Sequence, residues 1–429
     1  MGLAEFAEEG TASGMAPVSR LHLLLVGADH ITCPIGVREA LARRLTYRRL
    51  RHVGGTRPPW DDLLLLTTCN RVEAYAATRS AVRASRAICQ AFRLKGDSPY
   101  LYSLEDEAAA EHLLRVASGF ESMAQGEGQV GTQVRRAALA RPNSWDKESG
   151  LASLFAHAAR AARRIRADAG LADGGASASA TAVRFIQQAI PIPNPDVVLI
   201  GTGKMARLAV DGLAGKGSLT LLGRNPRKAR GVGTSTGGES GGLNRLGEAL
   251  ARADVAIAAT SGRKPLITSR GLRPAIAKRS GRPLWLIDLG FPRNIDPGCG
   301  LLEGVTLVDL DGLAPWGWQP LPPSARAQAE SRIREETGRL LRLLTPGPEP
   351  DVARFRKAVE RARRDEVDRA FGRLPRLSPE ERLVIDKLAS RLVNRFLHAP
   401  TEWLRTLPEE LAAPTVAELV HRLRSPEGR

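Results

Sequence analysis

The chain has 429 residues, with 63 Lys+Arg against 46 Asp+Glu, a formal net charge of +17 and 43% hydrophobic residues. This composition excludes a mainly disordered protein, and at roughly 100–200 residues per domain the length suggests about two to four domains. The basic excess is compatible with a polyanionic partner such as nucleic acid, and equally with a GC-rich coding bias that favours Arg, Ala and Gly.

Patterns for membranes, disulfides and metals are missing from the sequence. No apolar run approaches the ~20 residues of a membrane span, and the first residues carry acidic rather than basic groups. We therefore expect no membrane association and a cytoplasmic location. The four cysteines, Cys33, Cys69, Cys89 and Cys299, form no CxxC pair, and the seven histidines are scattered. We expect reduced thiols and no metal site.

Residues 1–20 have no periodicity and are expected to be a flexible extension, and residues 21–172 are typical of a mixed α/β domain. A buried strand begins at Leu21 and a helix at Pro34. The apolar runs 61–68 and 72–78 predict two strands joined by a tight turn at Cys69. Helical periodicity follows at 81–92, 105–118, 130–140 and 151–168.

A small, polar stretch over 171–180 predicts a linker or a helix start, and beyond it the rhythm changes. Short β-rich runs alternate with helical segments over 173–320, which predicts a parallel, doubly wound sheet of the Rossmann type. The glycine-rich segment 231–242 is expected to be a flexible surface loop.

The remainder, 321–429, is helical, with a rigid proline-rich break at 345–350. Its expected helices are 324–344, 352–371, 378–397 and 414–424. Long amphipathic helices without a β partner often bury their apolar faces against another copy of the chain, so we expect a homodimer. The fold class is therefore multidomain, with two α/β parts followed by an α-helical part.

The strand ending at Gly201 leads into a glycine-rich turn and a helix, a pattern that holds a dinucleotide pyrophosphate at a helix N-terminus. Arg224 and Asn225 end the next strand, where an acidic residue would bind the ribose of NAD, and they favour the 2′-phosphate of NADPH. A lone glycine fingerprint is weak evidence. The alternative, that Arg224 only ends a strand at the protein surface, therefore stays open. The candidate cofactor residues are Gly201, Thr202, Gly203, Lys204, Met205, Ala206, Arg224 and Asn225.

Cys69 lies in the run Thr68-Cys69-Asn70-Arg71, where a nearby cation favours the thiolate needed for nucleophilic attack. A cysteine by itself is more often a small buried hydrophobe. A reductant-binding domain favours catalysis here, because an enzyme thioester can accept hydride and yield an aldehyde. His112, Ser122, Glu127, Gln129 and Gln133 would line the same pocket if their segment bends over Cys69, whereas a single helical His is more often an ordinary surface or core residue.

Seven segments, in order between Leu21 and about Arg405, resemble the glutamyl-tRNA reductase family. They are GADHITCPIGVREAL, TTCNRVEAYA, HLLRVASGFESMAQGEGQVGTQV, LIGTGKMARLA, LIDLGFPRNIDP, VDLDGL and LVNRFLHAP. The resemblance implies an N-terminal catalytic domain, a Rossmann-like NADPH domain, a long spine helix and a C-terminal helical dimerisation domain. It also implies reduction of glutamyl-tRNA(Glu) by NADPH to glutamate-1-semialdehyde through a cysteine thioester, the first step of tetrapyrrole synthesis by the C5 pathway.

The resemblance assigns roles at matching positions. Cys69 matches the nucleophile and His112 a histidine important for activity. The substrate contacts it implies are Thr68, Asn70, Arg71, Ser122, Glu127, Gly128, Gln129 and Gln133, and the nucleotide loop runs from Gly201 to Ala206. A homodimer is implied, and so is a partner aminotransferase that takes up glutamate-1-semialdehyde.

Some positions depart from the family pattern. Ile31 stands where a basic residue is usual, Cys33 replaces an Ala, and Gly128 replaces a common Pro, which loosens the expected substrate loop. Two other functions stay open on the residues alone. One is a catalytically silent tRNA-binding or regulatory paralogue, and the other is an NADP-dependent dehydrogenase for a small hydroxy acid. The joint presence of Cys69, Arg71, His112 and the glycine loop counts against the first, and the second leaves the 21–170 domain and the Cys69 segment without a task.

Overall fold

A computed structural model describes the chain over 21–55, 58–123, 128–140, 150–171, 177–233, 238–262, 264–317, 322–344, 348–374, 377–406 and 415–420. The expectations for the extension 1–20 and for part of the linker 171–180 lie outside these residues. The chain divides into two compact units, Met1–Leu341 and Arg342–Arg429, which are described separately.

The first part of the chain forms a four-stranded antiparallel sheet in the order β2-β3-β1-β4. Its strands are β1 (His22–Asp29), β2 (Asp62–Thr67), β3 (Arg71–Thr78) and β4 (Tyr102–Glu105). The register pairs Asp29 with Arg71 and Thr67 with Val72, so the ends of three strands meet beside the turn that carries Cys69.

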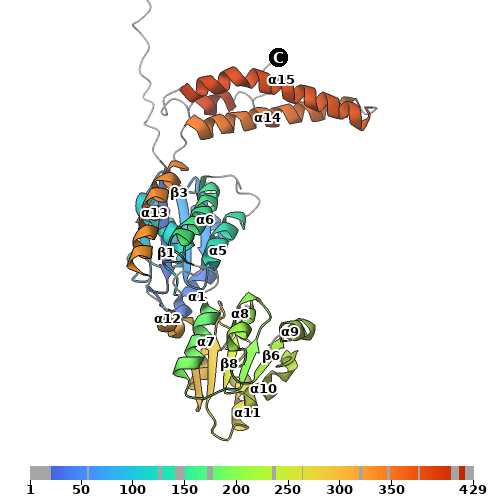
Figure 1. Cartoon of the computed structure of the whole chain (residues 1–429). Helices are drawn as coiled ribbons and strands as arrows, with labels where there is room; N and C mark the ends of the chain where they lie inside the picture. The colour runs from blue at the N-terminus through green and yellow to red at the C-terminus, as the bar shows by residue number, and fades with distance from the viewer. Residues whose placement is uncertain are drawn as a thin grey trace, which may run out of the picture. The chain divides into compact units, whose positions relative to one another are not determined.

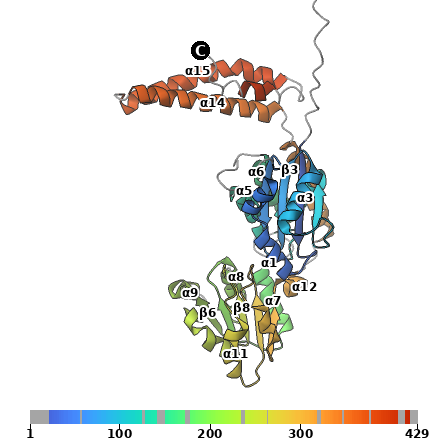
Figure 2. The same ribbon diagram turned by 180° about the vertical axis from the view of Figure 1, so that it is seen from behind.

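Helices cover both faces of this sheet (Figure 1, Figure 2), which explains why β1 and β3 are almost continuously buried. One face packs in a cluster with α1 (Ile35–Arg44), α2 (Tyr47–Gly54) and α3 (Ala81–Phe92). The other face carries α4 (Asp106–Ala117), α5 (Gln129–Leu139) and α6 (Gly150–Asp168), where Phe155 meets Tyr75 edge to face. Sequence analysis predicted all of these helices and strands except the short α2 and β4.

The second part of the chain has a six-stranded parallel sheet in the order β10-β9-β8-β5-β6-β7, which confirms the doubly wound fold. The strands are β5 (Val197–Ile200), β6 (Leu219–Gly223), β7 (Glu239–Gly242), β8 (Val255–Ala258), β9 (Leu284–Asp288) and β10 (Val305–Val308). The helix α7 (Ala178–Ala189) precedes β5. The helices between the strands are α8 (Lys204–Leu213), α9 (Pro226–Gly233), α10 (Leu246–Arg252) and α11 (Ser269–Ala277), with the 3-10 turns Leu243–Arg245 and Pro297–Leu301.

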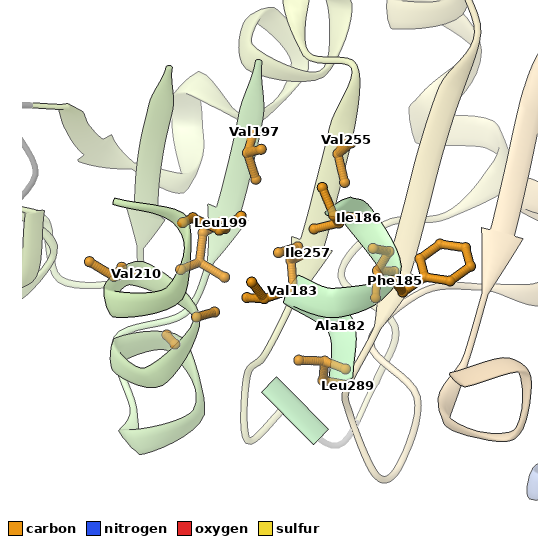
Figure 3. Packing of buried hydrophobic residues seen from close by; sticks show 14 of the residues in the cluster. Ala182, Val183, Phe185, Ile186, Val197, Leu199, Val210, Val255, Ile257 and Leu289 are labelled. Atoms are coloured by element: carbon orange, nitrogen blue, oxygen red, sulfur yellow. The ribbon is translucent and has the colours of Figure 1, made fainter. Parts of the chain in front are cut away.

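The core of this domain forms where α7 and α8 cross the sheet. Figure 3 shows Val183 and Ile186 of α7 and Val210 of α8 meeting Leu199 and Ile257 of the central strands. Ser177 caps α7 by accepting from the Ala180 N–H at 3.1 Å, so the polar stretch before it supplies a helix start.

The expectation of a flexible loop over 231–242 is wrong for the residues that the structure describes. Gly231–Gly233 complete α9, and Glu239–Gly242 form the edge strand β7, paired in parallel with β6. Strand pairing uses backbone groups only, and a side chain on Gly238 would lie 2.1 Å from the Leu219 carbonyl oxygen. Glycine is therefore required for the close approach of this segment to β6.

Two helices lead from the nucleotide domain back to the first sheet domain. The helix α12 spans Leu310–Gly317, and α13 spans Pro323–Arg342. Glu336 of α13 binds His157 at 2.8 Å and Arg164 at 3.0 Å, both on α6. The expected spine helix thus packs along the N-terminal domain.

The C-terminal unit is an antiparallel pair of helices, α14 (Pro348–Arg373) and α15 (Pro379–Thr406). Val352 and Phe355 pack with Leu397 and Leu404, and a helical turn at 415–420 adds Val416 and Val420. The expected break at 345–350 is wrong at 348–350, which begin α14 because proline is tolerated in a first turn. The rest of that break lies outside the described residues. No described helix is long and apolar enough to cross a membrane.

Candidate active site

Cys69 lies at the tip of the β2–β3 hairpin. The Thr68 N–H donates to the Arg71 carbonyl at 2.9 Å, and the Asn70 N–H donates to the Thr68 hydroxyl at 3.1 Å. These bonds hold the four-residue turn, and Cys69 is half-buried while Cys33, Cys89 and Cys299 are buried. Burial raises the pKa of each of those three thiols, to about 11 for Cys33 and Cys299, so they are poor nucleophiles.

A completely buried arginine on α1 supports this turn from behind. The Arg38 guanidinium donates to the Cys69 carbonyl at 3.3 Å, to the Cys33 carbonyl at 2.6 Å and to Asp311 of α12 at 2.5 Å. Asp311 also accepts from the Ile35 N–H at 2.7 Å. Sequence analysis missed Arg38, because nothing local in the helix indicates that its side chain reaches the cysteine turn.

Arg71 and His112 meet in a buried network around Glu73. Glu73 Oε1 accepts from Arg71 at 3.0 Å and from the Tyr102 hydroxyl at 2.7 Å, and it lies 2.9 Å from His112 Nε2. Its other oxygen accepts from the Tyr75 hydroxyl at 2.9 Å. Arg71 also donates to the Glu121 carbonyl, which ties the strand to the turn after α4. The Arg71 side chain is therefore committed to groups of the protein.

The charges of this network stabilise one another. Burial by itself would raise the pKa of Glu73, but Arg71 and His112 outweigh it and lower that pKa to about 2. Burial likewise opposes the charge of Arg71, yet Glu73 raises the pKa of the guanidinium above its usual value. Burial and the Glu73 charge raise the pKa values of Tyr75 and Tyr102, so both phenols stay protonated donors.

Cys69 opens into a small cavity that both α/β domains line. Its walls are Cys69 and Asn70 of the hairpin, Met123, Ala178 and Thr181 of α7, and Leu310, Leu313, Ala314 and Gly317 of α12. Asn70 is 3% exposed, and its Oδ1 has no hydrogen-bond partner among the described residues. A buried acceptor without a partner is a group that a substrate donor can satisfy.

A second hollow of about 420 Å³ lies beside it, lined by His30, Ser122 and Glu121 among others. Burial lowers the pKa of His30 to about 4, so this imidazole is neutral at physiological pH. Its Nδ1 has no hydrogen-bond partner within the described residues. Ser122 was predicted as a site residue from the sequence, whereas His30 was not. His30 reaches this hollow only because it follows the end of β1 in the folded domain.

The other expected substrate residues lie at the start of α5. Gly128 precedes the helix, and Gln129 opens it and contacts the Met205 sulfur at 3.9 Å. The side-chain Oε1 of Gln133 is buried without a partner in the described part of the chain. Glu127 lies outside the described residues. The Gln129 contact joins this region to the nucleotide-binding turn.

The expected cofactor residues surround a cavity of about 930 Å³ at the carboxyl ends of β5 and β6. Its lining includes Gly201 through Met205, Arg224 and Asn225. Four further residues with polar side chains, Arg207, Lys228, Thr260 and Ser261, also line it and were not predicted from the sequence. Ala206 does not line the cavity, because it lies on the face of α8 that is fully buried in the core. Asn225 caps α9 through its side-chain Oδ1, which accepts from the N–H groups of Arg227 and Lys228.

This cavity fits a dinucleotide phosphate. Gly201 has a φ of +134°, and a side chain there would lie 2.3 Å from the Ala259 carbonyl oxygen, so glycine is needed for the turn. A Cβ on Gly203 would project into open space, where a ligand can approach the backbone. The first N–H groups of α8 have no side-chain cap at Gly203, and four cations, Lys204, Arg207, Arg224 and Lys228, line the wall.

Three family models match consecutive parts of the chain. Residues 26–169 match the glutamyl-tRNA(Glu) reductase N-terminal domain, 186–315 the shikimate/quinate 5-dehydrogenase domain, and 325–424 the glutamyl-tRNA(Glu) reductase dimerisation domain. Within the described residues, no group of three or more His, Cys, Asp or Glu side chains is arranged to hold a metal ion.

Curated relatives match along nearly the whole chain. The glutamyl-tRNA reductase of Chloroflexus aurantiacus is 32% identical over 411 residues, covering 90% of this chain and 95% of the relative. That of Myxococcus xanthus is 31% identical, covering 91% and 90%. A solved glutamyl-tRNA reductase from Methanopyrus kandleri is 25% identical, with 94% and 98% of the two chains covered and a TM-score of 0.39.

A Rossmann-type cavity beside a half-buried thiol defines an NAD(P)-dependent oxidoreductase of the multidomain α/β class. Within that class, the chain belongs to the glutamyl-tRNA reductase family.

Proposed function

We propose that this protein reduces glutamyl-tRNA(Glu) to glutamate-1-semialdehyde with NADPH, the first step of tetrapyrrole synthesis by the C5 pathway. The observation that carries the proposal is the Cys69 cavity, because the hairpin thiol and elements of the nucleotide domain line the same space. A thiol placed there is accessible to an ester and lies beside the domain that holds the reductant.

The proposed chemistry has two stages. The Cys69 sulfur attacks the ester carbonyl carbon of the glutamyl group, the bond from that carbon to the terminal ribose oxygen breaks, and the tRNA leaves with a proton on its hydroxyl. A glutamyl thioester remains on Cys69. NADPH, when bound, supplies the hydride that reduces this acyl group, after which the carbon–sulfur bond breaks, the thiolate takes up a proton and the aldehyde leaves.

The residues around Cys69 divide this work. Arg38 and the Thr68–Arg71 bond hold the backbone of the nucleophile. Asn70 and Gln133 have buried side-chain oxygens, without partners among the described residues, that the glutamyl group can satisfy. We assign substrate binding to them with Thr68, Arg71, Ser122, Gly128 and Gln129. His112, held by Glu73, is the proposed proton donor or orienting group.

Replacing the nucleophile tests the proposal. Purified full-length protein, glutamyl-tRNA and NADPH should yield the semialdehyde, and Cys69→Ser should abolish it because a hydroxyl is a much weaker nucleophile than a thiol. Cys89→Ser, which alters a buried thiol on α3, is the matched control and should stay active. Without NADPH, labelled glutamate should attach to the wild type and not to Cys69→Ser. Normal semialdehyde production by the serine variant would refute the mechanism.

The preference for NADPH rests on the cations at the end of β6. We expect Arg224→Asp to shift the ratio of kcat/KM values from NADPH toward NADH, because a carboxylate repels a 2′-phosphate and accepts from ribose hydroxyls. Arg207→Ala changes a cation of the same cavity without adding a carboxylate, so it should weaken both cofactors together. An unchanged preference in Arg224→Asp would remove the assignment.

The proposed assembly is a homodimer formed through the C-terminal helices. Apolar side chains on α15 are exposed in the single chain, among them Leu388, Leu392 and Phe396 at helical spacing. A second copy of the chain would cover them.

An aminotransferase that consumes glutamate-1-semialdehyde is the proposed partner in solution, because the aldehyde product is reactive.

A further inference from the structure

A basic cleft separate from the Cys69 cavity lies between α5, α6 and the start of α8. It has a volume of about 400 Å³ and is lined by five cationic residues, Arg135, Arg160, Arg163, Arg166 and Lys204. No acidic side chain is among its described lining residues. We refer to the hollow lined by these five residues as the basic cleft.

Three of the five cations have no counter-charge in the described part of the chain. Arg160 and Arg163 are exposed on α6, and Arg135 is exposed on the neighbouring helix α5. The described ion pairs include none of them, whereas Arg164, the next residue on α6, binds Glu336 at 3.0 Å. Arg164 therefore holds α13, whereas Arg160 and Arg163 of the same helix make no ion pair among the described residues.

The floor of the cleft consists of small residues. Ala117, Gly131, Ala159 and Ala162 line it, and a side chain on Gly131 would lie 3.1 Å from the Ala117 carbonyl oxygen. Close packing of α5 on α6 at these positions leaves a hollow that the longer arginine side chains surround. Like charges gathered around a concave surface repel one another, and an anion in the hollow removes that repulsion.

We propose that the basic cleft binds the phosphodiester backbone of the tRNA substrate. This inference rests on the proposed function and adds a phosphate-binding subsite to it. Arginine favours phosphate because its planar fork donates two parallel hydrogen bonds, and the i,i+3 spacing of Arg160 and Arg163 places two forks on one helix face. Gln129 lines the cleft and contacts Met205 of the nucleotide turn, so RNA held here lies beside the catalytic domain's substrate residues.

A bound cofactor is the other source of phosphate, because Lys204 lines both the basic cleft and the cofactor cavity. Arg135, Arg160 and Arg163 line the cleft only. Their replacement therefore separates the two ligands.

The test compares full-length wild type, Arg160→Ala/Arg163→Ala and Arg83→Ala/Arg86→Ala. The control pair removes two exposed arginines with the same i,i+3 spacing from α3, outside the cleft. Uncharged tRNA(Glu) binding is measured by fluorescence anisotropy between about 50 and about 200 mM salt. NADPH binding and the thermal midpoint are measured in parallel.

We expect the cleft variant to bind tRNA roughly tenfold more weakly near physiological salt. The slope of log K against log salt should shrink by about 1.5, since each lost phosphate contact removes about 0.7–0.9 from the slope. NADPH affinity and the thermal midpoint should match those of the wild type. Arg135→Ala should reproduce the effect at about half the size.

Several results would overturn the proposal. Equal tRNA affinity and salt slope in wild type and cleft variant would exclude phosphate contacts here, and an equal loss in the α3 control would indicate only net charge. Weaker NADPH binding with unchanged tRNA binding would assign the cleft to the cofactor. If the wild type fails to bind tRNA at all, the proposed function itself is wrong. If Cys69→Ser is inactive but the cleft variant binds tRNA as tightly as the wild type, only the present inference is refuted.

Discussion

His112 Nε2 lies 2.9 Å from the Oε1 atom of Glu73, a carboxylate with no exposed surface. The same oxygen accepts from Arg71 and Tyr102, so the histidine is one of three partners of a single buried charge. A buried charge is tolerated only when it is paired and hydrogen-bonded, and removing one partner leaves the others uncompensated. Glu73 therefore positions both candidate residues, His112 and Arg71.

The first prediction concerns the pH dependence of stability. Because the pKa of Glu73 falls from 4.5 to about 2 on folding, its stabilisation is complete above about pH 4.5 and is lost as the pH falls through about 2. At about 1.4 kcal/mol per pKa unit, the contribution is at most about 3 kcal/mol. In urea unfolding at several pH values, Glu73→Gln should be less stable at pH 7 and should lose less stability on acidification than wild type. Glu107→Gln, exposed on α4, is the control, and parallel pH profiles for Glu73→Gln and wild type would contradict the assignment.

The second prediction separates two glycines of the cofactor turn. Gly201→Ala should destabilise the protein by about 2 kcal/mol or more, because its φ of +134° and the nearby Ala259 carbonyl exclude a side chain. Gly203→Ala has room for its methyl group and should keep its stability while weakening NADPH binding, since the methyl occupies space that the ligand needs. Thermal melting and NADPH titration distinguish the two. Equal cofactor affinity in Gly203→Ala and wild type would show that the turn does not contact the phosphates.

The third prediction concerns Arg38, which joins the Cys69 carbonyl to Asp311. Arg38→Met should lower the free energy of unfolding by about 3 kcal/mol, because it leaves a carboxylate and two carbonyls without their donor. Acylation of Cys69 should also slow, measured by transfer of labelled glutamate without NADPH. Asp311→Asn keeps hydrogen-bonding capacity and should lie between wild type and Arg38→Met. Unchanged acylation in a folded Arg38→Met variant would exclude a positioning role.

The fourth prediction concerns the exposed apolar side chains of α15. Leu392→Asp/Phe396→Asp should convert the expected dimer to a monomer, because two buried carboxylates would oppose association. Asn394→Asp, exposed on the same helix between them in sequence, should leave the dimer intact. Light scattering during size-exclusion chromatography gives the mass directly. A monomeric wild type at micromolar concentration would refute the assembly.

Most of the elements were predictable because their signals are local. The glycine turn, the β5 run before it and Arg224 after β6 are adjacent in sequence to the elements they define, so the Rossmann-type cavity followed from short patterns. The edge strand β7 was missed because its residues pair through the backbone with β6, and their composition resembles a loop.

The sequence by itself determined the family, the parallel sheet with its cofactor turn, and the choice of Cys69 as the thiol of interest. Only the tertiary structure decided what surrounds that thiol. Arg38 and Glu73 gain their roles from partners tens or hundreds of positions away, as in the Arg38–Asp311 pair, and the arginines of α5 and α6 line one cleft only because those two helices pack together. A side chain's burial and partners depend on which elements pack together, and that packing is a property of the whole chain.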